Sequence, residues 1–162
     1  MSFDLKGYAL SAEDGTAVWF LDTRMTVKAG GDETKGAFTF LEWAAPVGFG
    51  PPSHRHDRED EAFYLIEGAI EVSCGDRQWD VGPGGFVFLP RGIPHSFVVS
   101  AGPVRGLQVT APAGFERFIG ELGTPAPGPG LPPPSAPDVP RLIEASARYG
   151  YEILGPPAGK RE

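Results

Sequence analysis

The sequence predicts an all-β domain that is followed by short helices near the C-terminal end. Up to about residue 112, short segments rich in aromatic and β-branched residues alternate with Gly, Pro or Asp. This pattern indicates many short strands joined by turns, as in a β-sandwich or a β-barrel. Beyond residue 110 the apolar residues adopt helical spacing, and a proline-rich segment follows. We therefore assign the β-domain to residues 1–112.

Seven segments have the composition of strands. The dipeptide Gly75-Asp76 separates two of them and predicts a tight hairpin turn. Glycine adopts positive φ angles that other residues resist, so we assign bends to Gly68, Gly82, Gly84 and Gly92. The predicted strands are residues 16–21, 37–44, 62–66, 69–74, 78–81, 86–89 and 95–99.

Residues 113–123 are predicted to form a short amphipathic helix. Its apolar residues recur at helical spacing before the stop signal Gly123, and they are Phe115, Phe118, Ile119 and Leu122. Residues 124–140 contain eight prolines in seventeen positions, so this segment is predicted to be an extended connector.

A last helix is predicted to begin after Asp138, a favourable N-cap residue, and to end at Gly150. We assign residues 141–162 to this helix and a tail. Two arrangements fit the pattern. Both helices pack on the outside of the barrel, or one of them covers its mouth and lines a substrate cavity.

The composition predicts a substantial apolar core. The chain has 162 residues, of which 41% are hydrophobic and 22% charged. A net charge of −7 without clustered Lys and Arg argues against a nucleic-acid partner. The sequence shows neither a charged start followed by an apolar run nor a run of roughly 20 apolar residues. We therefore expect a cytoplasmic protein without a membrane segment, in which the single cysteine, Cys74, is a small strand residue.

All three histidines fall in one pattern that predicts a metal site. His54 and His56 point to the same face if their segment is extended, because side chains on a strand alternate. Glu61 can return to that point after a short loop, and His95 must arrive from another strand. Three imidazoles and a carboxylate suit one divalent transition metal per chain, Fe, Mn, Ni, Co, Cu or Zn. Taken singly, each histidine could instead be a packing residue and Glu61 a solvated loop charge.

The residues around this pattern resemble the two motifs of the cupin superfamily. The first motif is matched by Gly48, His54, His56, Glu61 and Gly68, all within residues 48–68. The second is matched within residues 84–99 by Gly84, Pro90, Gly92 and His95, but Val99 stands where an Asn is usual. The resemblance implies a double-stranded β-helix, or jelly-roll barrel, with His54, His56, Glu61 and His95 as metal ligands. Glu59 is the rival carboxylate, but its spacing from His56 is too short for the motif.

Strand parity predicts an apolar pocket around the ion. Phe63 and Leu65 share the parity of Glu61, and Phe97 shares that of His95. Phe38 and Phe40, or Trp43 on the opposite parity, are expected to line the neighbouring strand. Such a pocket favours a hydrophobic, aromatic or enol-bearing small molecule as substrate. These aromatic side chains could also simply fill the barrel.

Within the superfamily, residues 48–97 look most like cupins that are grouped with quercetin 2,3-dioxygenase. The resemblance implies cleavage of an enol-bearing substrate by dioxygen, with Glu61 as the proton acceptor. Two alternatives stay open: a redox-neutral isomerase, cyclase or decarboxylase, and a binding protein without turnover. The resemblance also implies a homodimer, formed through an outer sheet face or an exchanged N-terminal strand. In the first case, outward residues such as Tyr64 and Ile66 would lie on the contact face.

Overall fold

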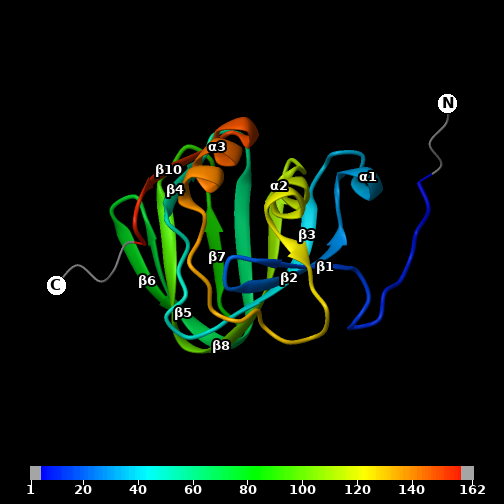
Figure 1. Ribbon diagram of the computed structural model, residues 1–162, viewed down its shortest axis with the longest axis horizontal. Helices are drawn as coiled ribbons and strands as arrows, with labels where there is room; N and C mark the ends of the chain where they lie inside the picture. The colour runs from blue at the N-terminus through cyan, green and yellow to red at the C-terminus, as the bar shows by residue number, and fades with distance from the viewer. Residues whose placement is uncertain (1–4, 158–162) are drawn as a thin grey trace.

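The fold is a jelly-roll barrel of antiparallel strands with helices on one side. The computed structural model describes residues 5–157. Its strands are β1 (Thr16–Phe20), β2 (Thr23–Ala29), β3 (Thr39–Ala45), β4 (Ser53–His56), β5 (Asp60–Cys74), β6 (Arg77–Val81), β7 (Phe86–Leu89), β8 (His95–Ala111), β9 (Thr124–Pro125) and β10 (Tyr151–Gly155). They pair in the order β10-β4-β8-β3-β2-β1-β9, while β5 pairs with β6, β7 and β8 (Figure 1). The predicted all-β class is therefore confirmed.

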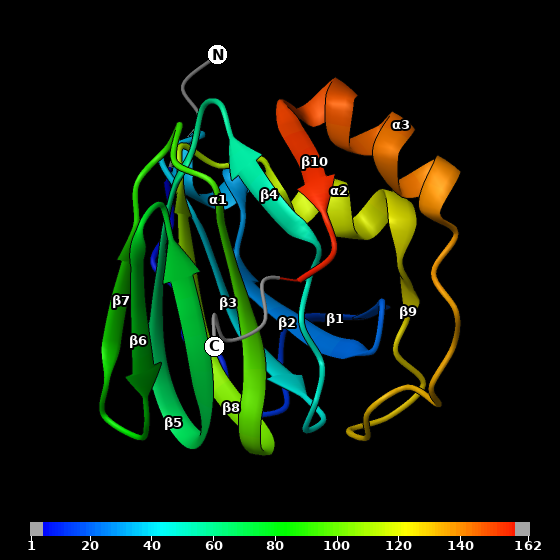
Figure 2. The same cartoon turned by 90° about the vertical axis from the view of Figure 1, so that its left-hand side faces the viewer.

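The helices are α1 (Gly31–Thr34), α2 (Phe115–Leu122) and α3 (Val139–Tyr149). Figure 2 shows α2 and α3 on one side of the barrel and strands β5, β6 and β7 on the other. In the part of the chain that the structure describes, no helix is both long and apolar enough to cross a membrane.

Strand β5 joins two segments that the sequence suggests are separate. It runs through residues 62–66 and 69–74 and shifts its register against β8 on both sides of Glu67. The bend lies at Gly68, where φ is 76° and a Cβ atom would lie only 2.6 Å from the carbonyl oxygen of Ala101. Gly68 therefore allows one long strand to bend and still pair with β8 on both sides of the bend, because only glycine fits this backbone and this approach.

Strand pairing places the candidate ligands next to one another. His54 on β4 lies opposite His95 on β8. Strand β10, which the sequence did not suggest, pairs with the other edge of β4 and sets Tyr151 opposite His56. Its sequence is only five residues long, so the hydrogen bonds to β4 define it.

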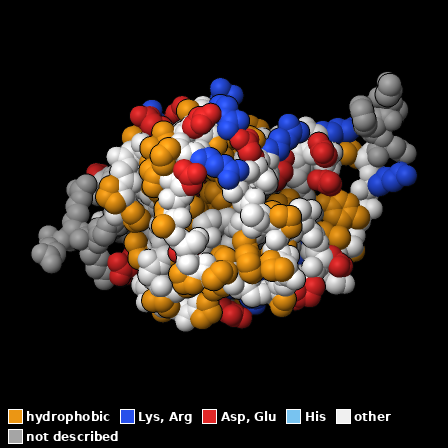
Figure 3. Space-filling model, viewed as in Figure 1, with side chains coloured by type: hydrophobic (Ala, Val, Ile, Leu, Met, Phe, Trp, Pro, Cys, Tyr) orange, Lys and Arg blue, Asp and Glu red, His pale blue; other side chains and the backbone are white. Residues whose placement is uncertain are grey.

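The two capping residues that the sequence suggests, Asp138 and Gly150, begin and end α3. The Asp138 carboxylate accepts a hydrogen bond from the Arg141 N–H at 3.1 Å, and Gly150 ends α3 with a φ of 79°. Glu121 on α2 then holds α3, since its backbone oxygen accepts from Arg141 and its carboxylate accepts from Arg148 and Tyr149. Figure 3 shows the mixed acidic and basic side chains over these helices.

Candidate metal centre

Four side chains from three strands meet inside the barrel. His54 and His56 lie on β4, Glu61 on β5 and His95 at the start of β8, and each offers a ligand atom within 4.8 Å of the others. The centroids of the three imidazole rings lie 4.5 to 5.2 Å apart. The structure thus brings together all four residues that the histidine pattern singles out.

Backbone carbonyls orient two of the three imidazoles. Nδ1 of His54 lies 2.7 Å from the Pro52 oxygen, and Nδ1 of His95 lies 3.0 Å from the Ile93 oxygen. A carbonyl can only accept, so each Nδ1 carries a proton, and Nε2 is the ring nitrogen that is left to face an ion. This is the usual arrangement of metal-binding histidines, whose other nitrogen donates to a fixed acceptor.

Glu61 is a buried, ionised carboxylate. Its Oε1 accepts a hydrogen bond from Gln108 Nε2 at 2.7 Å, and its Oε2 lies 3.1 Å from Nε2 of His95. Burial alone would raise the pKa of Glu61, but positive charge on His56 and the hydrogen bond from His95 outweigh it and lower the pKa to about 2. Burial and the neighbouring His95 lower the pKa of His54 to about 4. At neutral pH both groups therefore have the protonation state that a metal ligand needs.

Glu59 is buried too, but it lies on the outer side of His56. Its Oε2 lies 3.4 Å from His56 Nδ1, and both of its oxygens accept hydrogen bonds from the Tyr151 hydroxyl, at 3.0 and 2.8 Å. Burial would lower the pKa of His56, but the carboxylates of Glu61 and Glu59 raise it. Of the two rival carboxylates, Glu61 is therefore the one that faces the other candidate ligands.

The charges of the site fit a divalent cation. Glu59 and Glu61 are each 5% exposed, and within residues 5–157 neither forms a salt bridge with Lys or Arg. Two buried carboxylates are costly unless positive charge lies beside them, and the groups beside these two are the imidazoles of His56 and His95. A divalent transition metal at the three imidazoles and Glu61 would supply that charge, and this donor set suits such an ion.

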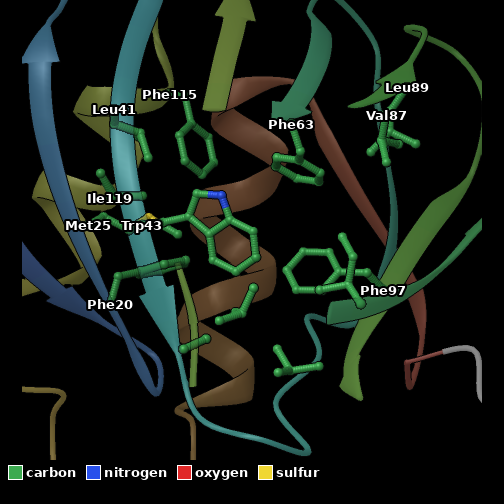
Figure 4. Close-up of a cluster of buried hydrophobic side chains, with 14 of the residues drawn as sticks. Phe20, Met25, Leu41, Trp43, Phe63, Val87, Leu89, Phe97, Phe115 and Ile119 are labelled. Carbon is green, nitrogen blue, oxygen red and sulfur yellow. The ribbon is translucent and has the colours of Figure 1, made fainter. Parts of the chain in front are cut away.

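The four side chains open onto one apolar cavity. Its volume is about 80 Å³, and its walls come from the barrel and from α2, α3 and β10. Trp43 lines the cavity and lies against Phe63 and Phe97, with ring centroids 5.5 and 5.2 Å away (Figure 4). Further lining residues are Phe20, Phe49, Phe115, Phe118, Leu142, Ser146, Tyr151 and Ile153.

The structure changes part of the predicted pocket. Phe63 and Phe97 line the cavity, but Phe38 is 39% exposed at the surface, and Phe40 is half-buried without lining it. The reason is the parity of β3, where odd-numbered residues face inward and put Trp43 there instead. Leu65 is buried as parity predicts, but it lies in the core and does not line the cavity.

The sequence is similar to that of known proteins. The family model described as "Cupin domain" matches residues 41–110. Quercetin 2,3-dioxygenase of Bacillus subtilis is 25% identical over 150 residues, which cover 92% of this chain and 44% of that protein. The chain thus spans less than half the length of this relative.

Solved structures share the fold. A predicted oxalate decarboxylase from Thermotoga maritima superposes with a TM-score of 0.59 at 17% identity, covering 64% of this chain and 98% of that chain. KdgF from Halomonas sp. superposes with a TM-score of 0.54 at 18% identity, covering 59% and 85%. At these identities the likeness concerns the architecture alone.

Proposed function

We propose that this chain is a metal-dependent dioxygenase, because residues 41–110 match the cupin-domain model and the chain is similar to quercetin 2,3-dioxygenase. Its substrate is a small, largely apolar molecule with an enol or enol-like hydroxyl. The observation that carries the proposal is the position of His54, His56, Glu61 and His95, all of which line the aromatic cavity. A ligand in the cavity therefore reaches the candidate ion directly.

The side chains divide the work between holding an ion and moving a proton. His54, His56 and His95 would hold the ion, with Glu61 as the fourth ligand. A divalent transition metal, when bound there, makes a coordinated enol more acidic and, if redox-active, supports electron transfer between substrate and dioxygen. The enol proton passes to a carboxylate oxygen of Glu61, while Gln108 keeps the other oxygen in place. Both atoms of dioxygen enter the products, so the reaction consumes no separate reductant.

The size of the cavity restricts the substrate. Ligand pockets commonly have volumes of about 300 to 1,000 Å³, whereas this cavity has about 80 Å³. We propose a substrate with no more than one ring. The Ser146 hydroxyl lines the cavity, is 1% exposed and has no hydrogen-bond partner among residues 5–157. A second polar group on the substrate would satisfy it.

The test starts with the metal. Elemental analysis of untagged protein should find about one redox-active ion per chain. Oxygen uptake is then measured with protein reconstituted separately with Fe, Mn, Ni, Co and Cu, against single-ring enols, catechols, β-diketones and flavonols. Labelled ¹⁸O₂ should place both oxygen atoms in the products. Turnover that needs metal but no oxygen would replace the proposal with a redox-neutral reaction, and a lack of turnover throughout would contradict it.

Two variants on β5 test whether turnover depends on the carboxylate of Glu61 or is lost on replacement of any glutamate of this strand. Glu61→Gln removes the carboxylate at the cavity and should abolish turnover. Glu67→Gln changes the same residue type on the same strand, but its side chain is exposed and contacts Arg105, so turnover should be kept. Equal activity of Glu61→Gln and the parent protein would rule out the role of Glu61.

A further inference from the structure

Strand β10 lies outside the matched residues 41–110, and it covers the strand that carries two of the candidate ligands. It pairs with β4 so that Tyr151 lies opposite His56 and Ile153 opposite His54. The turn before it is held as well, because the Asp57 N–H donates to the Gly150 oxygen at 2.9 Å. Any movement of β10 therefore bears on the backbone of both histidines.

Tyr151 reaches the metal centre through Glu59. The tyrosine is 6% exposed, and its ring centroid lies 4.6 Å from that of His56. Its hydroxyl donates to both oxygens of Glu59, and Glu59 Oε2 lies 3.4 Å from His56 Nδ1. Within residues 5–157, Nδ1 of His56 has no partner that meets full hydrogen-bond geometry. Glu59 is the acceptor poised for it, as Pro52 and Ile93 are for the other two imidazoles.

The contacts from Tyr151 to Glu59 and from Glu59 to His56 favour a role other than packing. Phenylalanine would fill the space of Tyr151 without burying a hydroxyl group. A buried carboxylate is costly unless it is paired with a positive charge. An acceptor behind a ligating imidazole fixes the ring and its tautomer and makes the ligating nitrogen more basic. A carboxylate does this more strongly than the carbonyls behind His54 and His95, because it carries a full charge.

We propose that Tyr151 and Glu59 are positioning residues of the metal centre, so that a strand outside the cupin motifs helps to set metal affinity. Tyr151 orients Glu59, and Glu59 orients and polarises His56. The inference rests on the metal centre of the proposed function but not on dioxygen consumption.

Tyr149 provides a matched control for Tyr151. Each hydroxyl donates to a glutamate at 2.8 Å, Tyr149 to Glu121 and Tyr151 to Glu59, and the two tyrosines flank Gly150. Only the bond of Tyr151 leads to a candidate ligand. Comparison of Tyr151→Phe with Tyr149→Phe therefore separates a lost hydrogen bond in general from a lost contact to the metal centre.

The experiment measures Co²⁺ affinity by competition with a chelator, and thermal unfolding of the metal-free proteins. Loss of the acceptor behind a metal-ligating histidine typically weakens metal affinity by about 10- to 100-fold. We therefore expect a loss of affinity in this range for Glu59→Gln. For Tyr151→Phe we expect the lower end of that range, roughly tenfold. Tyr149→Phe should bind Co²⁺ like the parent protein, even where its metal-free form unfolds at a lower temperature.

The outcomes distinguish this inference from the proposed function. Parent-like Co²⁺ affinity in Glu59→Gln overturns it, and Glu59→Gln, with its unchanged shape, keeps the test decisive if Tyr151→Phe does not fold. Equal losses in Tyr149→Phe and Tyr151→Phe overturn it as well, since the effect would then be structural. If the parent protein binds no Co²⁺, both this inference and the proposed metal centre fail. If it binds Co²⁺ but never consumes oxygen, only the dioxygenase fails.

Discussion

Replacement of Glu116 tests whether one carboxylate holds the wall of the cavity in place. Glu116 lies in the first turn of α2, and its carboxylate accepts hydrogen bonds from the N–H groups of Gly31 and Gly114, both at 2.9 Å. The Thr39 hydroxyl at the start of β3 donates to it as well. The carboxylate therefore ties α1, β3 and the start of α2 together, and Phe115 and Phe118, on either side of Glu116 in α2, line the cavity.

The expected magnitude follows from what Glu116→Gln leaves behind. The amide oxygen can replace one carboxylate oxygen, but its NH₂ group then faces a backbone N–H donor. At least one hydrogen bond to a charged group is lost, which amounts to about 1.5 to 3 kcal/mol. Each kcal/mol shifts the melting temperature of a protein of this size by about 2 to 4 °C. We therefore expect Glu116→Gln to unfold roughly 3 to 12 °C below the parent protein at pH 7.

The pH dependence gives a second, independent check. Burial would raise the pKa of Glu116, but the hydrogen bonds from Thr39, Gly31 and Gly114 outweigh it and lower the pKa. A carboxyl group with a lowered folded-state pKa stabilises the protein above its unfolded pKa of about 4.3. That contribution is lost as pH falls through the folded-state pKa. The difference between the parent protein and Glu116→Gln should therefore be constant near neutral pH and shrink below about pH 4.

The assay is thermal unfolding followed by circular dichroism from pH 7 down to pH 3, with Glu144→Gln on the exposed face of α3 as the control. The control should unfold within about 1 °C of the parent protein, because exposed substitutions rarely matter. Equal melting temperatures of Glu116→Gln and the parent at pH 7 would refute the reasoning. So would a difference that does not shrink in acid.

Four further changes test other parts of the structure. Gly68→Ala should destabilise the fold by about 2 kcal/mol or more, because its Cβ would lie 2.6 Å from a backbone oxygen of β8 at a φ of 76°. The control is Gly128→Ala, whose Cβ would meet nothing within 4 Å. Equal midpoints of urea unfolding for the two variants would contradict this prediction. Asp138→Ala removes the N-cap of α3 and should cost about 1 kcal/mol by chemical denaturation, whereas no loss would show that the cap is dispensable. Gln108→Leu removes the 2.7 Å bond to Glu61 and should weaken Co²⁺ binding roughly tenfold in the same competition assay, and unchanged affinity would speak against that support. Chelation of a metal present at 100 times its dissociation constant should lower the free energy of unfolding by about 2.7 kcal/mol. Calorimetry would detect this loss as a lower melting temperature, and an unchanged melting temperature would argue against a bound ion.

Local sequence signals predicted much of this protein. The histidine spacing and Glu61 pointed to one site, and the structure brings these residues within 4.8 Å of one another. Helix α3 begins and ends at the capping residues that the sequence suggested, Asp138 and Gly150. These signals act over a few residues, through strand alternation, helical spacing and capping, so no knowledge of distant contacts was needed. The homodimer, the cytoplasmic location and the native metal stay predictions.

Tertiary structure decided what depends on partners far along the chain. Trp43 instead of Phe38 or Phe40 lines the cavity, because the inward face of β3 depends on its register against β2 and β8. Glu59 could not be placed by its spacing alone, since Tyr151, 92 residues away, holds it behind His56. Strand β10 exists through its hydrogen bonds to β4, and pairing over such a separation leaves no periodic trace in either segment. The sequence alone thus determined which residues can bind a metal, and long-range pairing determined what surrounds and supports them.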